Sequence, residues 1–245
     1  MTMPLLSLDR VSKRYWRGRH EIVVLDNVSF DLDAGEFAAI FGQRSAGKTP
    51  LLRIAAGIEA ADSGTVSFAG EDITASPSTA RRPGLHEQMG WMRRSGPYLA
   101  SMEMLDYVAL PLLAGMRHEE AHRRATRALR SMNADELARA TWTEMSDPER
   151  TLVMLAQAIV REPALLLADD PTMGLGVGER EIVLGLLRKV AEENGMAVLM
   201  TVPDVPDMLR SHTVMSLSDG ELILPTRRHA DADVIDFPRE RGESA

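Results

Sequence analysis

The chain has 245 residues, with 28 basic against 36 acidic side chains, a net charge of −8 and an isoelectric point near 5.3. This charge balance argues against a surface built to bind nucleic acid or anionic lipid, so any phosphate site has to be local. Cysteine is absent, which excludes disulfides, thiolate metal sites and a cysteine nucleophile. We find neither a membrane-spanning apolar run nor a secretory pattern at the start, and expect a soluble protein of the cytoplasm.

The elements expected in chain order belong to the α/β class. Strands are expected within 21–42, interrupted by a turn at 33–35, and a shorter pair within 63–73. Helical spacing of apolar residues follows over 98–139, and then a helix, an apolar strand, a second helix and a second apolar strand over 149–202. This alternation predicts a parallel sheet covered by helices. We expect one domain over 1–245, divided into a core (1–94 and 149–224), a helical subdomain (95–148) and a loose charged tail (225–245).

A phosphate-binding loop is the clearest motif in the chain. The pattern G-x-x-x-x-G-K-[ST] is fitted by Gly42, Gln43, Arg44, Ser45, Ala46, Gly47, Lys48 and Thr49, between an apolar strand and a helix expected to begin near Gly47. In such a loop the backbone N–H groups and the helix N-terminus surround phosphate oxygens, Lys48 adds a full positive charge, and Thr49 offers its hydroxyl to Mg²⁺. A glycine-rich turn with a coincidental lysine is the alternative. Pro50 is tolerated in the first helical turn but removes one N–H.

Several segments together resemble the nucleotide-binding subunits of ATP-binding cassette (ABC) transporters. They are "VSKRY", "VLDNVSFDLDAGEFAAIFG", "GKT", "LLRIAAGIEAADSGTVSFAGEDI", "YVALPLLAG" and "ALLLADDPT". The resemblance covers about 5–224, and "VALPLLAG" makes the chain similar to subunits that drive lipoprotein release and macrolide efflux. It implies a P-loop NTPase core of the ABC type: a mixed sheet covered by helices, an N-terminal antiparallel β part and an inserted helical subdomain. It also implies ATP and Mg²⁺ as cofactors.

The resemblance implies two further binding residues. Tyr15 matches the aromatic residue that stacks on adenine, with Trp16 as the second choice, although either ring could simply pack. Asp169 is expected at the carboxyl end of an apolar strand beside the phosphate loop, where its carboxylate can hold Mg²⁺ through water. Capping a helix is the alternative role for such a carboxylate.

The groups that the family uses for hydrolysis are altered. Asp170 stands in place of the glutamate that positions the attacking water and is one methylene shorter, so it could act only after rearrangement. Pro203 replaces the switch histidine and has no side-chain donor. Arg94, preceded by Arg93, replaces a glutamine that contacts Mg²⁺; it could clamp a triphosphate or pair with acids on a partner.

The signature loop, usually L-S-G-G-Q, is altered too. It reads Met145-Ser-Asp-Pro-Glu149, in which Ser146 and Glu149 are spaced for a capping box that would satisfy the helix start internally. Pro148 removes a donor, and two carboxylates lie where a phosphate would dock. Gly176 replaces the aspartate that communicates across the dimer.

Three hypotheses follow. The first is an ATP-binding subunit of a membrane transporter that uses ATP as a dimer clamp or regulatory ligand, with weak or no hydrolysis. The second is an active ATPase motor that uses Asp170, and the third is a docking scaffold without nucleotide. The resemblance implies a transmembrane permease subunit whose short helix enters a groove near Arg94 to Leu110, and a second nucleotide-binding subunit in a homodimer or heterodimer. It therefore implies a location on the inner face of the cell membrane through that partner. The acidic charge balance leads us to expect no nucleic-acid partner.

Overall fold

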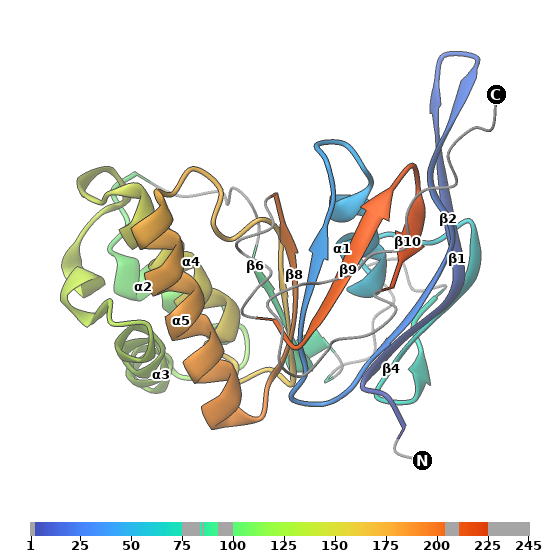
Figure 1. Ribbon diagram of the computed structural model, residues 1–245. Coiled ribbons are helices and arrows are strands. Elements are labelled where there is room, and N and C mark those ends of the chain that lie inside the picture. Colours follow the sequence, from blue (N-terminus) through green and yellow to red (C-terminus); the bar gives the residue numbers. More distant parts are fainter. Residues whose placement is uncertain (1–2, 75–83, 85, 93–99, 204–210, 225–245) are drawn as a thin grey trace.

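The computed structural model describes residues 3–74, 84, 86–92, 100–203 and 211–224, and Figure 1 shows two sheets with helices between and beside them. The strands are β1 (Leu6–Arg17), β2 (His20–Leu32), β3 (Phe37–Phe41), β4 (Ser63–Phe68), β5 (Glu71–Asp72), β6 (Met89–Met92), β7 (Leu165–Ala168), β8 (Ala197–Val202), β9 (Thr213–Ser218) and β10 (Glu221–Ile223). The α-helices are α1 (Lys48–Ala55), α2 (Met104–Ala109), α3 (His118–Ser131), α4 (Asp147–Ile159) and α5 (Val177–Asn194). Short 3₁₀ turns are η1 (His86–Gln88), η2 (Leu110–Leu112), η3 (Asp135–Arg139) and η4 (Trp142–Glu144).

The central sheet is mixed and buried on both faces. Within the described residues its strand order is β10-β9-β3-β8-β7-β6, with parallel pairs from β9 to β6 and an antiparallel edge strand β10. Successive side chains of a strand point to opposite faces, so β3 sends Phe37 and Ala39 into one core and Ala38 and Ile40 into the other. This burial on both faces explains why the parallel strands read as continuous apolar runs.

The second sheet is antiparallel and lies across α1 from the first. Its order is β2-β1-β4-β5, and the β1–β2 hairpin extends beyond the rest of the molecule in Figure 1. The two sheets meet where the Asp26 N–H donates to the Gly220 carbonyl oxygen over 2.8 Å. Asp219 and Gly220 both have positive φ (49° and 83°), as a type I′ turn between β9 and β10 requires.

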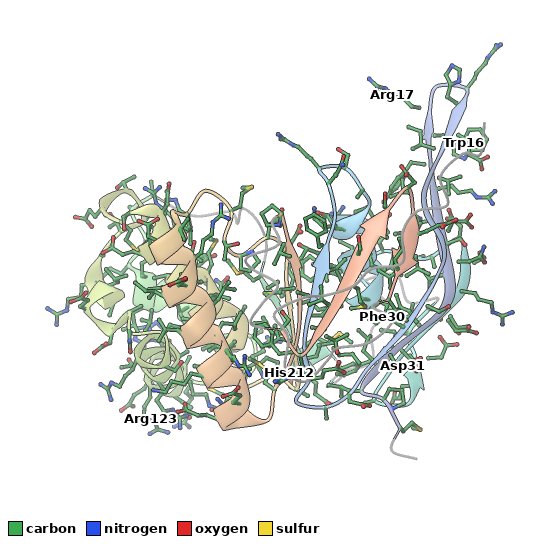
Figure 2. All side chains as sticks on the ribbon, viewed as in Figure 1. Trp16, Arg17, Phe30, Asp31, Arg123 and His212 are labelled. Atoms are coloured by element: carbon green, nitrogen blue, oxygen red, sulfur yellow. The ribbon has the colours of Figure 1, made fainter. Side chains whose placement is uncertain are left out.

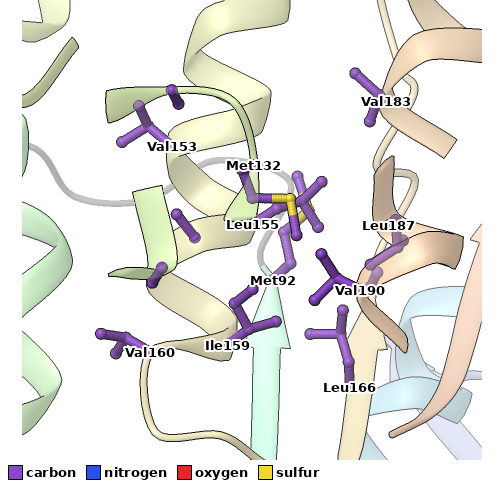
Figure 3. Close-up of a cluster of buried hydrophobic side chains, with 14 of the residues drawn as sticks. Met92, Met132, Val153, Leu155, Ile159, Val160, Leu166, Val183, Leu187 and Val190 are labelled. Atoms are coloured by element: carbon purple, nitrogen blue, oxygen red, sulfur yellow. The ribbon is translucent and has the colours of Figure 1, made fainter. Parts of the chain in front are cut away.

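The two cores lie on opposite faces of the central sheet. One is filled by α1 and the inner face of the antiparallel sheet. The other is filled by α2 to α5, and Figure 3 shows its centre, where side chains of α4 and α5 meet those of β6 and β7. The labelled side chains there include Met92, Leu155, Ile159, Leu166 and Leu187.

The expected α/β class with a mixed sheet, an antiparallel β part and helices is confirmed. Strands β1, β9 and β10 were not predicted individually, although the Asp219-Gly220 pair between apolar runs is a hairpin signal. The expected boundary between 148 and 149 falls inside the first turn of α4, and the tail 225–245 lies outside the described residues. Within the part of the chain that the structure describes, no helix combines the length and apolarity needed to cross a membrane.

Candidate nucleotide site

Three parallel strands bring the candidate site together at one edge of the central sheet. Gly42 follows β3, Asp169 and Asp170 follow β7, and Pro203 follows β8. Because these neighbouring strands are parallel, their carboxyl ends share an edge, which is where open α/β sheets bind ligands. Residues up to 161 positions apart in the sequence therefore meet in one place.

The phosphate loop leaves β3 and enters α1 through backbone conformations that suit an anion site. Ser45 has φ 70° and Gly47, the residue before the helix, has φ 100°. Left-handed residues alternating with right-handed ones turn successive N–H groups inward, and the helix N-terminus adds partial positive charge. Gln43, Arg44 and Ser45 form the exposed tip, Ala46 is half-buried and donates its N–H to the Gln43 carbonyl, and Pro50 lies in the first turn of α1.

Both loop glycines are also required by packing. A Cβ on Gly42 would lie 2.5 Å from the Leu217 carbonyl oxygen on β9, and one on Gly47 would lie 2.5 Å from the Val24 carbonyl oxygen on β2. Real Cβ atoms do not come that close to backbone, so neither position admits a side chain without a shift. The close approach of β9 and β2 thus fixes the shape of the loop from two sides.

Lys48 is the cation of the loop and is only 8 % exposed. Its ammonium group donates to the Gly42 carbonyl oxygen and, over 3.2 Å, to the Gln43 carbonyl oxygen. The charge is therefore folded back over the loop that a phosphate would occupy. A triphosphate could replace these carbonyl contacts with stronger contacts to charged oxygens.

Thr49 and Asp169 lie together as a metal site would need. The Thr49 hydroxyl donates to Asp169 Oδ2 over 2.8 Å, and Asp169 is 4 % exposed. Asp169 Oδ1 accepts a second hydrogen bond of 3.0 Å from the hydroxyl of Thr201, a fully buried residue on β8. The set offers hydroxyl and carboxylate oxygens, the ligands that Mg²⁺ prefers, so these residues could hold that ion.

Thr201 is a functional candidate that our reading of the sequence missed. Its hydroxyl also accepts the Asp170 N–H over 2.9 Å, so one side chain holds both aspartates in place. The available signal was a single hydroxyl inside the otherwise apolar stretch "MAVLMTV". Its partners could not be read from that stretch because they lie 31 and 32 residues away.

Asp170 is 5 % exposed and has φ 49°, a left-handed conformation that aspartate tolerates better than most residues. Its carbonyl oxygen accepts the Met173 N–H in the turn that follows β7. The backbone at Asp170 is thus fixed from both sides. Pro203, directly after β8, presents no side-chain donor to the same edge.

Tyr15 is held in place by its neighbours, whereas Trp16 is not. The Tyr15 hydroxyl donates to Glu59, and the Lys13 ammonium lies 5.6 Å from the centre of the Tyr15 ring. Burial, and then the hydrogen bond and negative charge of Glu59, raise the pKa of Tyr15 above its ordinary value. Trp16 is 69 % exposed and lies near the far end of the β1–β2 hairpin (Figure 2).

The N-terminus of α4, where the signature loop was expected, is closed by its own side chains. The predicted capping box is present: the Ser146 N–H and hydroxyl both donate to Glu149 Oε2 over 2.7 Å. These two hydrogen bonds, the hydroxyl's first, lower the pKa of Glu149. Asp147 forms an ion pair of 2.9 Å with Arg150. A carboxylate therefore occupies the position where a helix start would otherwise attract an anion.

Of the two remaining predicted positions, the structure describes Gly176 but not Arg94. Gly176 is the residue before α5, and its N–H donates to the Glu179 carboxylate over 2.7 Å. Arg94 lies outside the described residues, so its role stays a prediction.

The comparisons with known proteins agree with this fold. The family described as "ABC transporter" matches residues 25–173. The dimeric cassette MJ0796, solved in a post-hydrolysis state with ADP and Pi, is 26 % identical, covers 89 % of this chain and 96 % of its own, and has a TM-score of 0.81. The cassette cbiO1 from Clostridium perfringens, part of the transporter complex cbiONQ, is 23 % identical over 90 % of this chain and 87 % of its own, with a TM-score of 0.79, and supports the fold. The matched family covers more than half of the chain, so this protein belongs to the ABC transporter family and carries its ATP-binding cassette.

Proposed function

We propose that this cassette is the ATP-binding subunit of a membrane transporter, that it binds Mg-ATP at the phosphate loop, and that it hydrolyses ATP slowly or not at all. The observation that carries the proposal is the hydrogen bond from Thr49 to Asp169, because it joins the loop to the strand end where a metal ion would be held. When bound, Mg²⁺ would neutralise charge on the β- and γ-phosphates. Lys48 would then leave its carbonyl partners for phosphate oxygens.

Tyr15 is proposed as the adenine platform in preference to Trp16. A ring held by Glu59 and Lys13 is oriented before the ligand arrives, so stacking on it costs little conformational freedom. The exposed indole of Trp16 would have to be ordered on binding.

The proposal of slow hydrolysis is supported by Asp170 and Pro203. A general base has to lie within about 3 Å of the water that it activates, and its loss costs about 10²- to 10⁴-fold in rate. Asp170 is short and buried, and Thr201 holds its backbone N–H, so we expect its carboxylate to reach such a water only after the turn rearranges. Pro203 offers no donor to a γ-phosphate.

The altered signature loop at the start of α4 would act on the partner cassette. In a head-to-tail dimer, such as the family forms, the start of α4 would face the triphosphate bound by the other subunit. The Glu149 carboxylate and the ion-paired Asp147 would repel that triphosphate rather than donate to it. A homodimer would carry this defect at both sites, whereas a heterodimer with an intact partner would carry it at one.

A transmembrane partner is proposed to dock beside α2. Leu110 and Leu113, within the segment that resembles lipoprotein-release and macrolide-efflux subunits, are 43 % and 38 % exposed. Apolar side chains left at the surface suit a short helix from a permease. Arg94, at the other end of the expected groove, is proposed either to clamp nucleotide or to pair with an acid of the partner.

The test combines binding and turnover. We expect Mg-ATP to bind the purified chain, while phosphate release stays far below the rate of a family member with an intact glutamate. Asp170→Ala should leave the low rate unchanged, with or without the transmembrane partner, and Asp170→Glu combined with Pro203→His should raise it. Rapid phosphate release that Asp170→Ala abolishes would establish an active motor instead. Absence of any nucleotide affinity would leave only the docking scaffold.

A further inference from the structure

Asp106, His118 and His122 form a cluster in the helical part of the protein, separate from the residues of the nucleotide site. Asp106 lies on α2, and both histidines lie on α3. One possible ligand atom from each residue lies within 4.8 Å of those of the other two. His122 Nε2 and Asp106 Oδ1 are 2.8 Å apart, and the centres of the two imidazole rings are 4.0 Å apart. We propose that this cluster is a binding site for Zn²⁺ or a similar divalent transition metal.

The spacing on α3 suits that ion. Histidines four residues apart lie on one face of a helix, one turn above the other, so both rings can reach a single ion. The stretch His118-Glu119-Glu120-Ala121-His122 also fits H-E-x-x-H, in which the two histidines bind zinc and the glutamate does not. Asp106 supplies the third ligand from a different helix, which the spacing on α3 alone could not provide.

The ligand types favour zinc over the hard cations of the cell. Imidazole suits zinc and its neighbours in the first transition row, whereas Mg²⁺ and Ca²⁺ take oxygen ligands. Around tetrahedral zinc, neighbouring ligand atoms lie about 3.3–3.6 Å apart, given metal–ligand distances of about 2.0–2.2 Å. The Asp106–His122 contact of 2.8 Å therefore has to open by about 0.5–0.8 Å. His118 is exposed, so its ring can turn towards the ion.

The surrounding charges are compatible with a cation. Arg123 and Arg124, the next residues along α3, both pair with Glu120, and Arg123 lies at the outer surface of the helix (Figure 2). The positive end of the α3 dipole opposes a cation near His118, but this effect is small at an exposed helix end. Three protein ligands leave a coordination position for water, as in zinc sites that are not closed by a fourth side chain.

Metal binding here would fasten α2 to α3. Without metal, the described link between these residues is the single Asp106–His122 contact, in which both side chains are partly exposed. A shared ion would replace it with bonds from both helices to one centre. The loaded protein should therefore unfold at a higher temperature than the metal-free protein.

The experiment is calorimetric titration of the full, nucleotide-free chain with Zn²⁺. The buffer contains excess Mg²⁺, which occupies sites that prefer oxygen ligands. We expect one Zn²⁺ per chain, and binding at least about tenfold weaker in His118→Ala and in Asp106→Asn. Glu119→Gln removes a carboxylate from the same helical turn without removing a ligand, and His20→Ala removes an exposed histidine elsewhere. Both controls, and Thr49→Ala at the nucleotide site, should bind Zn²⁺ within about twofold of the wild type.

A spectroscopic measurement distinguishes the proposed site from chance surface binding. Co²⁺ in place of Zn²⁺ should give the visible absorption of a low-coordinate site, and this absorption should disappear in His118→Ala. His118 is exposed, so this variant should fold, and circular dichroism checks that it does. The proposal is overturned if no stoichiometric Zn²⁺ binds, or if Zn²⁺ binds equally well to His118→Ala and Asp106→Asn.

Discussion

Replacement of Lys48 tests the proposed phosphate contact most directly. Two unit charges 4 Å apart attract by about 4 kcal/mol at an effective dielectric constant near 20. In the present structure, however, the Lys48 ammonium already donates to the carbonyl oxygens of Gly42 and Gln43. Nucleotide binding would give up these contacts, which together contribute about as much as one charged hydrogen bond, about 1.5–3 kcal/mol, because the contact to Gln43 is long at 3.2 Å.

The net contribution of Lys48 to ATP binding is therefore about 1–2.5 kcal/mol, since the carbonyl contacts offset much of the attraction. Because 1.4 kcal/mol corresponds to tenfold in affinity, removal of the charge should weaken binding by about 5- to 60-fold. Lys48→Met is the preferred variant because methionine fills the space of the buried lysine stem. Lys189→Met, which removes an exposed lysine from α5, is the matched control.

The assay is calorimetric titration with a non-hydrolysable ATP analogue and Mg²⁺. An affinity of Lys48→Met within twofold of the wild type would refute the reasoning, because the ammonium would then make no contact with phosphate. Loss of affinity in Lys189→Met of the same size would refute it as well, since the effect would be one of net charge rather than of the loop.

Four further predictions concern stability and are checked by urea unfolding. The pKa of Tyr15 is raised, so the contact of its hydroxyl with Glu59 stabilises the fold below the unfolded pKa near 10 and is lost as pH rises through the folded pKa. The difference in free energy of unfolding between wild type and Tyr15→Phe should therefore shrink at high pH. An increase of this difference at high pH would contradict the prediction. Ser146→Ala should cost about 1 kcal/mol through loss of a cap. The pKa of Glu149 is lowered, so Glu149→Gln should destabilise above the unfolded pKa near 4.3, an effect lost as pH falls through the folded value; an equal effect at pH 7 and pH 3 would argue against the hydrogen bonds to Ser146. Gly47→Ala should cost more than about 2 kcal/mol, because of its φ of 100° and a carbonyl oxygen 2.5 Å from the new Cβ, and a cost under about 0.5 kcal/mol would show that the loop can move aside.

The phosphate loop and the apolar strands could be predicted from the sequence because their signals are local. A loop motif between an apolar strand and a helix, and the Ser146-x-x-Glu149 spacing of a capping box, each depend on residues close together in the chain. Such patterns act through backbone conformation, so the same residues specify the same local structure in many folds.

Contacts between distant segments needed the tertiary structure. Thr201 holds Asp169 and Asp170 from a neighbouring strand, and Glu59 holds Tyr15 across 44 residues. The sequence around Thr201 and around Glu59 contains no pattern that predicts these partners. The same holds for the proposed zinc site, where the spacing of His118 and His122 is visible in the sequence but Asp106 joins them only because α2 packs on α3. Local sequence thus determined which chemical groups this protein has, whereas the pairing of strands and helices decided which of them meet, because side-chain chemistry acts over a few ångströms and only the fold brings distant residues that close.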